Sequence, residues 1–313
     1  MKTPHLTFSL LVLLLIRSAA FATEVLLPEG MLTVRALDEA GAPIEGASAA
    51  IYSDVYGKKK VVQTTSVEGR ASGKLRAFVS LFFAVGKEGY YSVSGEYFFN
   101  QEQIKGEAST WAAQRWEPWN PTVEVTLKKK GTPIAMYAKW MIIEPPEKGK
   151  GVGFDLIIGD WIAPHGKGKV ADFVFDGRGA IEDGSYRLTW TFSNPGDGIQ
   201  FVAAAPGVVR SELKSPTEAP TDGYAPSLTT DGQRVIRVEG QISEKAACFV
   251  FRVRTLLNEK GKLISANYGK IYPGSNFRIA YYFNPTANSR TLEYDPKKNL
   301  FPDEFGGLVV NDP

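Results

Sequence analysis

Histidine, the side chain best suited to acid–base chemistry near neutral pH, is scarce in this chain. It occurs twice, and only His165 lies outside the first 22 residues. A hydrolytic triad would need this imidazole beside an orienting carboxylate such as Asp160 or Asp172. The G-x-S-x-G motif that presents a nucleophilic serine is absent from the sequence. We therefore expect an exposed turn here, in which His165, Lys167 and Lys169 are candidate ligand-binding residues.

Cysteine, another nucleophile and metal ligand, is equally scarce. Cys248 is the single cysteine and lies in an apolar stretch, which predicts a buried, unreactive thiol and excludes disulfides within the chain. With so few histidines and cysteines, no metal or other cofactor is expected. Carboxylates are plentiful, but a glycosidase needs two of them at a defined gap across a cleft, and spacing along the chain does not give that gap. We therefore assign no catalytic residue.

Aromatic and basic residues gather in two other places. Trp111, Trp116 and Trp119 lie in one short segment. Their flat faces could stack on sugar rings or cations, or the rings could plug the open end of a β-sandwich. Residues 128–169 contain eight lysines and four acidic residues. This excess could bind an acidic polymer or an anionic glycan, or it could form an ordinary solvated rim.

The N-terminus has the pattern of a secretory signal peptide over residues 1–22. Lys2 precedes an apolar run from Leu6 to Ile16, and Ala20 and Ala22 form a small-x-small cleavage site. The run is shorter than the roughly 20 residues that cross a bilayer, and no later stretch is apolar enough to do so. A secreted or periplasmic protein without a transmembrane segment is therefore expected.

The charge balance limits the kind of partner. The 313-residue chain contains 36 Lys and Arg against 34 Asp and Glu, and two of the basic residues, Lys2 and Arg17, belong to the expected signal peptide. The mature chain is therefore formally neutral and has no overall field to attract nucleic acid. No nucleic-acid partner is expected, and a glycan or a cell-surface protein remain as candidates.

Alternating apolar and polar residues predict β-strands along almost the whole mature chain. Strands are expected at 32–37, 47–52, 61–65, 79–85, 91–99, 123–127, 134–143, 154–158, 171–175, 186–192, 200–204, 234–242, 248–256, 263–271, 277–283 and 291–294. A Lys-Lys-Lys-Gly-Thr-Pro sequence at 128–133 breaks the pattern and predicts a domain boundary. Residues 101–119 are expected to form an excursion with a short helix, and residues 211–227 a long surface loop.

The first part of the chain resembles a known family of β-sandwiches. Residues 32–47 comprise a strand followed by an Asp-x-x-Gly-x-Pro turn, which resembles the opening of carboxypeptidase-regulatory-like domains. Residues 65–71 stand where that family has a second turn before a strand, with Ser66 in place of the usual Asp, and residues 85–91 are similar to a later turn. The resemblance covers about residues 30–128. It implies a transthyretin-like sandwich with an accessory, structural or binding role.

Together these patterns predict an all-β protein. After a signal peptide at 1–22, residues 23–130 are expected to form a transthyretin- or immunoglobulin-like sandwich. Residues 131–313 are expected to form a larger antiparallel β-sandwich or jelly-roll-like domain, in which residues 154–156, 159–169 and the turn at 194–198 resemble uncharacterised secreted bacterial proteins. The expected function is a non-catalytic binding or structural module at the cell surface. The alternative is a carbohydrate-binding or carbohydrate-active protein that uses the tryptophan cluster and acidic residues.

Overall fold

The computed structural model describes residues 27–53, 59–99, 104–105, 114–180, 185–203, 211–230, 236–238, 241–243, 246–274, 277–302, 310 and 312–313. The expected signal peptide and Trp111 lie outside these ranges. Within them the chain is all-β and contains no helix, which confirms the predicted fold class. Its contacts divide it into two compact units, Met1–Lys129 with Gly207–Ser211 and Lys130–Pro206 with Glu212–Pro313. The domain boundary expected at residues 130 and 131 stays a prediction.

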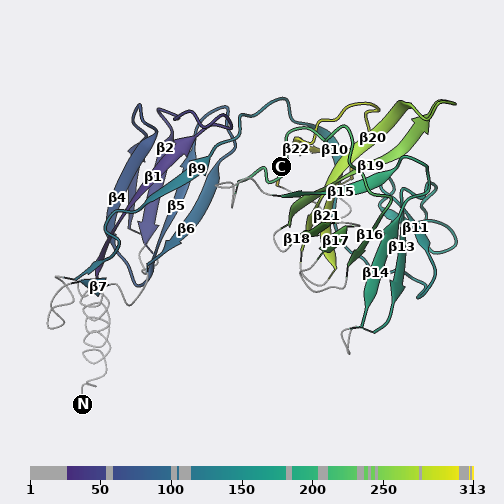
Figure 1. Ribbon diagram of the computed structural model, residues 1–313, viewed down its shortest axis with the longest axis horizontal. Helices are drawn as coiled ribbons and strands as arrows, with labels where there is room; N and C mark the ends of the chain where they lie inside the picture. The colour runs from purple at the N-terminus through teal and green to yellow at the C-terminus, as the bar shows by residue number, and fades with distance from the viewer. Residues whose placement is uncertain are drawn as a thin grey trace, which may run out of the picture. The chain divides into compact units, whose positions relative to one another are not determined.

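Two sheets build the first unit (Figure 1). Its strands are β1 (Glu29–Leu37), β2 (Ser48–Ser53), β3 (Lys60–Thr64), β4 (Arg70–Arg76), β5 (Ser80–Gly86), β6 (Val93–Phe98), β7 (Ile104–Lys105), β8 (Arg115–Trp116) and β9 (Thr122–Thr126). One sheet has the order β3-β2-β5-β6. The other has the order β4-β1-β8-β7, and β9 also pairs with β1 in parallel.

The alternation in β1 and β5 determines which side chains form the core of the first unit. Leu32, Val34 and Ala36 of β1 are fully buried, as are Leu81 and Val85 of β5. All five belong to one hydrophobic cluster. Because every second side chain of a strand points to the same face, the period-two apolar pattern of the sequence becomes one continuous core.

Two glycines of the first unit share a backbone conformation but differ in their surroundings. Gly69, directly before β4, has φ of 74°, and Gly41, in the turn after β1, has φ of 81°. A β-carbon on Gly69 would overlap the backbone carbonyl oxygen of Ala36, whereas nothing lies within 4 Å of the corresponding position on Gly41. Both sites therefore favour glycine for its positive φ, and only Gly69 also needs the missing side chain.

Gly69→Ala is expected to destabilise the first unit by about 2–3 kcal/mol, because it adds a steric overlap to a strained backbone. Gly41→Ala has the same backbone strain without the overlap and is expected to cost about 1 kcal/mol. Urea denaturation of both variants, monitored by tryptophan fluorescence, measures the difference. Equal losses in the two variants would contradict the steric argument.

Two further sheets build the second unit. Its strands are β10 (Ile134–Ile142), β11 (Val152–Asp155), β12 (Asp160–Trp161), β13 (Phe173–Arg178), β14 (Arg187–Thr191), β15 (Gly198–Ala203), β16 (Ser227–Thr230), β17 (Ile236–Val238), β18 (Gln241–Ser243), β19 (Ala246–Leu257), β20 (Leu263–Pro273), β21 (Arg278–Asn284) and β22 (Tyr294–Asn299). The six-stranded sheet has the order β15-β19-β20-β21-β10-β22. The seven-stranded sheet has the order β12-β11-β13-β14-β16-β17-β18.

An aromatic core joins the two sheets of the second unit. Phe173, Phe175 and Trp190 come from the seven-stranded sheet, and Phe251 and Tyr281 come from the six-stranded sheet. All five are buried. Phe173 and Phe251 meet edge to face, with ring centroids 5.0 Å apart. Two sheets that bury facing side chains in this way form a β-sandwich.

The segment 211–227 differs from the surface loop expected there. The structure buries Leu213, Ser215 and Ala219 completely. Ala219 belongs to a hydrophobic cluster that also contains Val250 of β19 and Tyr268 of β20. The prolines and glycine of this segment keep most of it out of a sheet but do not keep it in solvent, because its apolar side chains cover part of the six-stranded sheet.

Of three other local expectations, one stays a prediction, one is wrong in detail and one is confirmed. In the described part of residues 101–119, the short strands β7 and β8 pair with each other, and residues 106–113, in the segment where a short helix was expected, lie outside the described residues. The single strand expected at 234–242 is a pair, β17 and β18. Cys248 is fully buried, as its apolar surroundings predicted.

Candidate functional site

The predicted site residues His165, Lys167 and Lys169 lie in the long connection between β12 and β13, which is fixed by a buried carboxylate at the end of β11. Oδ1 of Asp155 accepts the N–H groups of Ile157 and Ile158, at 2.9 and 3.1 Å. Its Oδ2 accepts the N–H groups of Lys169 and Val170, also at 2.9 and 3.1 Å. Burial alone would raise the pKa of Asp155, but these four hydrogen bonds hold it below its usual range.

Acid is expected to weaken the fold through Asp155. Its folded-state pKa lies below the ordinary value of 3.8, so its stabilisation is present above pH 3.8 and disappears as the pH falls through the folded-state pKa. The free energy of unfolding should therefore fall between pH 5 and pH 3, and fall less in Asp155→Asn. Urea denaturation of both proteins at the two pH values tests this, and an equal fall in both would contradict it.

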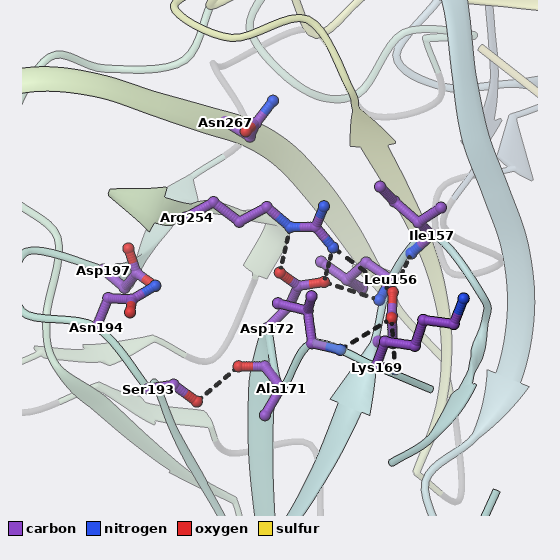
Figure 2. A network of polar contacts seen from close by, with 12 residues as sticks. Leu156, Ile157, Lys169, Ala171, Asp172, Ser193, Asn194, Asp197, Arg254 and Asn267 are labelled. Atoms are coloured by element: carbon purple, nitrogen blue, oxygen red, sulfur yellow. Dashed lines mark hydrogen bonds and ion pairs between the residues drawn. The ribbon is translucent and has the colours of Figure 1, made fainter. Parts of the chain in front are cut away.

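A second buried carboxylate links the two sheets of the second unit (Figure 2). Asp172 lies just before β13 and accepts two hydrogen bonds from Arg254 of β19, Nε to Oδ1 at 2.7 Å and Nη2 to Oδ2 at 2.8 Å. Its Oδ2 also accepts the N–H of Leu156, at 2.9 Å. The Asp172 side chain is fully buried, and that of Arg254 is 25% exposed and lies over the ring of Phe283. The pair is a bidentate inter-sheet contact.

Local backbone geometry aims Arg254 at this carboxylate. Arg254 has φ of 55°, which is uncommon for a residue other than glycine. It lies where the pairing of β19 with β20 shifts register between Val253 and Leu256. Such bulges redirect side chains relative to a regular strand. Arg254 was not predicted as a site residue, and the signal for it in the sequence was the pair of arginines, Arg252 and Arg254, within a mainly apolar strand.

The lysine-rich part of the connection runs along β12. Oδ2 of Asp160 accepts the N–H of Lys167 at 2.8 Å, and the N–H of Gly168 donates to the carbonyl of Trp161, also at 2.8 Å. A β-carbon on Gly166 or Gly168 would overlap backbone or side-chain atoms of residues 160 and 161. The glycines therefore let the chain approach β12 closely, and the intervening Lys167 is exposed, as is the next lysine along the chain.

His165 is positioned by a carboxylate that was not predicted from the sequence. Its Nε2 lies 2.9 Å from Oε1 of Glu147, and its side chain is 22% exposed. Nζ of Lys150 lies 2.5 Å from Oε2 of the same glutamate. The hydrogen bond from Lys150 is the main reason why the pKa of Glu147 lies below its usual range, and His165 adds to the effect. Asp160 and Asp172, the carboxylates considered for a triad, bind backbone N–H groups and Arg254 instead.

Trp116 is a core residue of the first unit. It is 2% exposed, and its ring stacks on Phe99 with centroids 5.6 Å apart. Its Nε1 donates to the carbonyl of Ala77 at 3.0 Å. This placement matches the plug alternative, because the ring offers no face to solvent.

The other two tryptophans of the cluster do not add an exposed platform with Trp116. Trp119 is half-buried, and the guanidinium of Arg115 lies 5.5 Å from its ring centroid. Trp111 lies outside the described residues. Since all three tryptophans belong to the first unit and His165 to the second, the predicted site residues are not one cluster within a unit. A tryptophan-based ligand site stays a prediction.

The described residues contain neither a group of metal ligands nor a membrane-spanning helix. Among them, no three or more His, Cys, Asp or Glu side chains are arranged to hold a metal ion. In the same residues, no helix has the length and apolar character needed to cross a membrane.

Comparison with known proteins adds little to this geometry. No protein-family model and no curated protein matches the chain. Among solved structures, 3-chlorocatechol 1,2-dioxygenase from Rhodococcus opacus 1CP is 13% identical over 33% of this chain and 60% of its own, with a TM-score of 0.24. The shaft pilin SpaA from Lactobacillus rhamnosus GG is 15% identical over 56% of this chain and 91% of its own, with a TM-score of 0.23.

A third similar structure, BcpA, the major pilin subunit of Bacillus cereus, is 10% identical over 81% of this chain and 66% of its own, with a TM-score of 0.25. The chain spans about 60% of the length of the dioxygenase, the first of these structures. Likenesses this weak carry no argument about activity, ligand or partner, so the function rests on the residues themselves.

Proposed function

We propose that this protein is exported, secreted or periplasmic, and acts as a non-catalytic binding or structural module at the cell surface. The main support is how the charged groups around the candidate site are used. Asp155 and Asp172 bind backbone N–H groups and Arg254, and Glu147 binds His165 and Lys150. Groups bonded in this way hold loops and sheets in place, which is a structural role.

The resemblance of the first unit supports the same proposal. In the turn after β1, Oδ1 of Asp38 accepts the N–H groups of Ala40 and Ala42, at 2.9 and 2.8 Å. This is the Asp-x-x-Gly-x-Pro turn on which the resemblance to carboxypeptidase-regulatory-like domains rests. We infer that the first unit is such a sandwich, which in that family is an accessory module.

Export and the lack of catalysis are tested separately. The full chain with a C-terminal tag is expressed in a Gram-negative host, and the expected result is a periplasmic or secreted protein that begins at Thr23. A protein retained in the cytoplasm would overturn the export proposal. The purified mature protein is then incubated with a panel of polysaccharides and chromogenic esters. Turnover that is lost in His165→Ala and kept in Lys260→Ala would overturn the non-catalytic proposal.

A further inference from the structure

We propose that two loops beside β11 and β12 form a binding site for an anionic polysaccharide. The site, the cationic face, consists of the exposed side chains of Lys148, Lys150, Lys167 and Lys169. The inference rests on the proposed function and deepens it, because an exported module encounters carboxylated and sulfated glycans. The ligand is identified by its chemistry, a chain of repeated carboxylate or sulfate groups.

The fold holds the two loops of the cationic face together. Lys148 forms a β-bridge with Gly177 of β13, and the N–H of the next residue donates to the Gly177 carbonyl at 2.8 Å. In the other loop, His165 contacts the same Glu147 carboxylate as Lys150. One carboxylate thus binds a basic side chain from each loop, which brings the two pairs of lysines onto one part of the second unit.

The backbone beneath Lys167 and Lys169 is fixed before any ligand binds. The N–H of Lys167 donates to Asp160, and the N–H of Lys169 donates to Asp155. A loop that is already ordered loses little conformational entropy when a ligand binds to it. The two lysines are separated by one glycine that packs against β12, so both ammonium groups project from a firm support.

Carboxylates close to this face are used internally. Asp155 and Asp172 are 2% exposed and are satisfied by backbone N–H groups and by the inter-sheet arginine. Within the described part of the chain, no carboxylate lies within ion-pair distance of Lys148, Lys167 or Lys169. Three ammonium groups are therefore available to an anionic ligand, although the mature chain as a whole is formally neutral.

Edge protection and nucleic-acid binding are different roles for these lysines, and each predicts a different result. Lysines beside an edge strand such as β12 can protect it from pairing with another copy, and their loss would then cause association. A nucleic-acid site would require a strong basic field, which a neutral chain lacks. A flexible anionic glycan needs only a short row of cations, so we favour it.

Affinity chromatography of the purified mature protein on polygalacturonate and dextran sulfate tests the proposal. We expect retention on at least one of them at about 20 mM salt, release by about 0.5 M salt, and no retention on neutral dextran. A variant in which all four lysines of the cationic face become glutamine should bind about tenfold more weakly, because each exposed contact is individually weak.

A second quadruple variant controls for net charge. It replaces four exposed lysines elsewhere in the second unit by glutamine: Lys260, Lys262, Lys297 and Lys298. This variant is expected to bind the glycans with an affinity within about twofold of the wild type. Equal weakening in both variants, or no retention of the wild type on either glycan column, would overturn the inference. So would stronger retention of the wild type on a parallel column of immobilised DNA than on either glycan. Association of the first variant with unchanged retention would overturn it in favour of edge protection. If the protein is exported as expected and turns over none of the tested substrates, any of these results leaves the proposed function standing.

Discussion

Asp172→Ala is expected to lower the free energy of unfolding of the second unit by about 3–5 kcal/mol. The aspartate side chain is fully buried and binds Arg254 through two short hydrogen bonds. Alanine would leave the guanidinium, three-quarters removed from water and lying over Phe283, with only the longer 3.5 Å contact to Asp155 to compensate for its lost hydration. It would also remove the acceptor of the Leu156 N–H group.

Urea denaturation at pH 7 measures this loss, and Glu218→Ala is the matched control. Glu218 also pairs with an arginine, Arg290, at 3.0 Å, but its side chain is 66% exposed, so its removal should cost less than about 1 kcal/mol. A double variant, Asp172→Ala with Arg254→Met, should lose less than the sum of its single variants, because neither member of the bidentate pair is then left buried without the other. Equal losses in Asp172→Ala and Glu218→Ala would show that the pair does not stabilise the sandwich.

The fold class could be predicted because most strands have a clear two-residue period. β1 and β5 alternate between core and partly exposed positions, and the structure has them within a few residues of the expected bounds. β4 was not evident from periodicity, since its residues Ser72, Gly73 and Lys74 interrupt any apolar alternation. Only the family resemblance, which expects a strand after the second turn, indicated it. A strand whose pairing is fixed by its neighbours needs little apolar pattern of its own.

The candidate site could be predicted only where its residues are close in sequence. His165, Lys167 and Lys169 were recognised because glycines and lysines alternate there. The contact between Asp172 and Arg254 joins residues 82 positions apart in different sheets. It depends on the packing of two sheets and on a bulge with an unusual φ at Arg254, and a single sequence encodes neither in a recognisable local pattern. Glu147 was missed for a similar reason, because only the folded chain brings His165 to it.

Trp116→Ala is expected to destabilise the first unit by about 3–5 kcal/mol and to leave retention on polygalacturonate or dextran sulfate unchanged. The ring is buried against Phe99, so its removal leaves a cavity in the core. It also leaves the Ala77 carbonyl without the indole N–H that now donates to it. Trp119→Ala should cost about 1 kcal/mol at most, since its ring is only half-buried and lies beside the exposed Arg115 guanidinium.

Thermal and urea unfolding of the two tryptophan variants, together with the same affinity columns, separates the two interpretations of the tryptophan cluster. A plug loses stability and keeps ligand retention, because its ring faces the core and the cationic face lies in the other unit. A stacking surface would do the reverse. Trp116→Ala protein that unfolds like the wild type but no longer binds glycan would therefore show that the ring contacts the ligand, and that the alternative expected from sequence, a carbohydrate-binding tryptophan cluster, is correct.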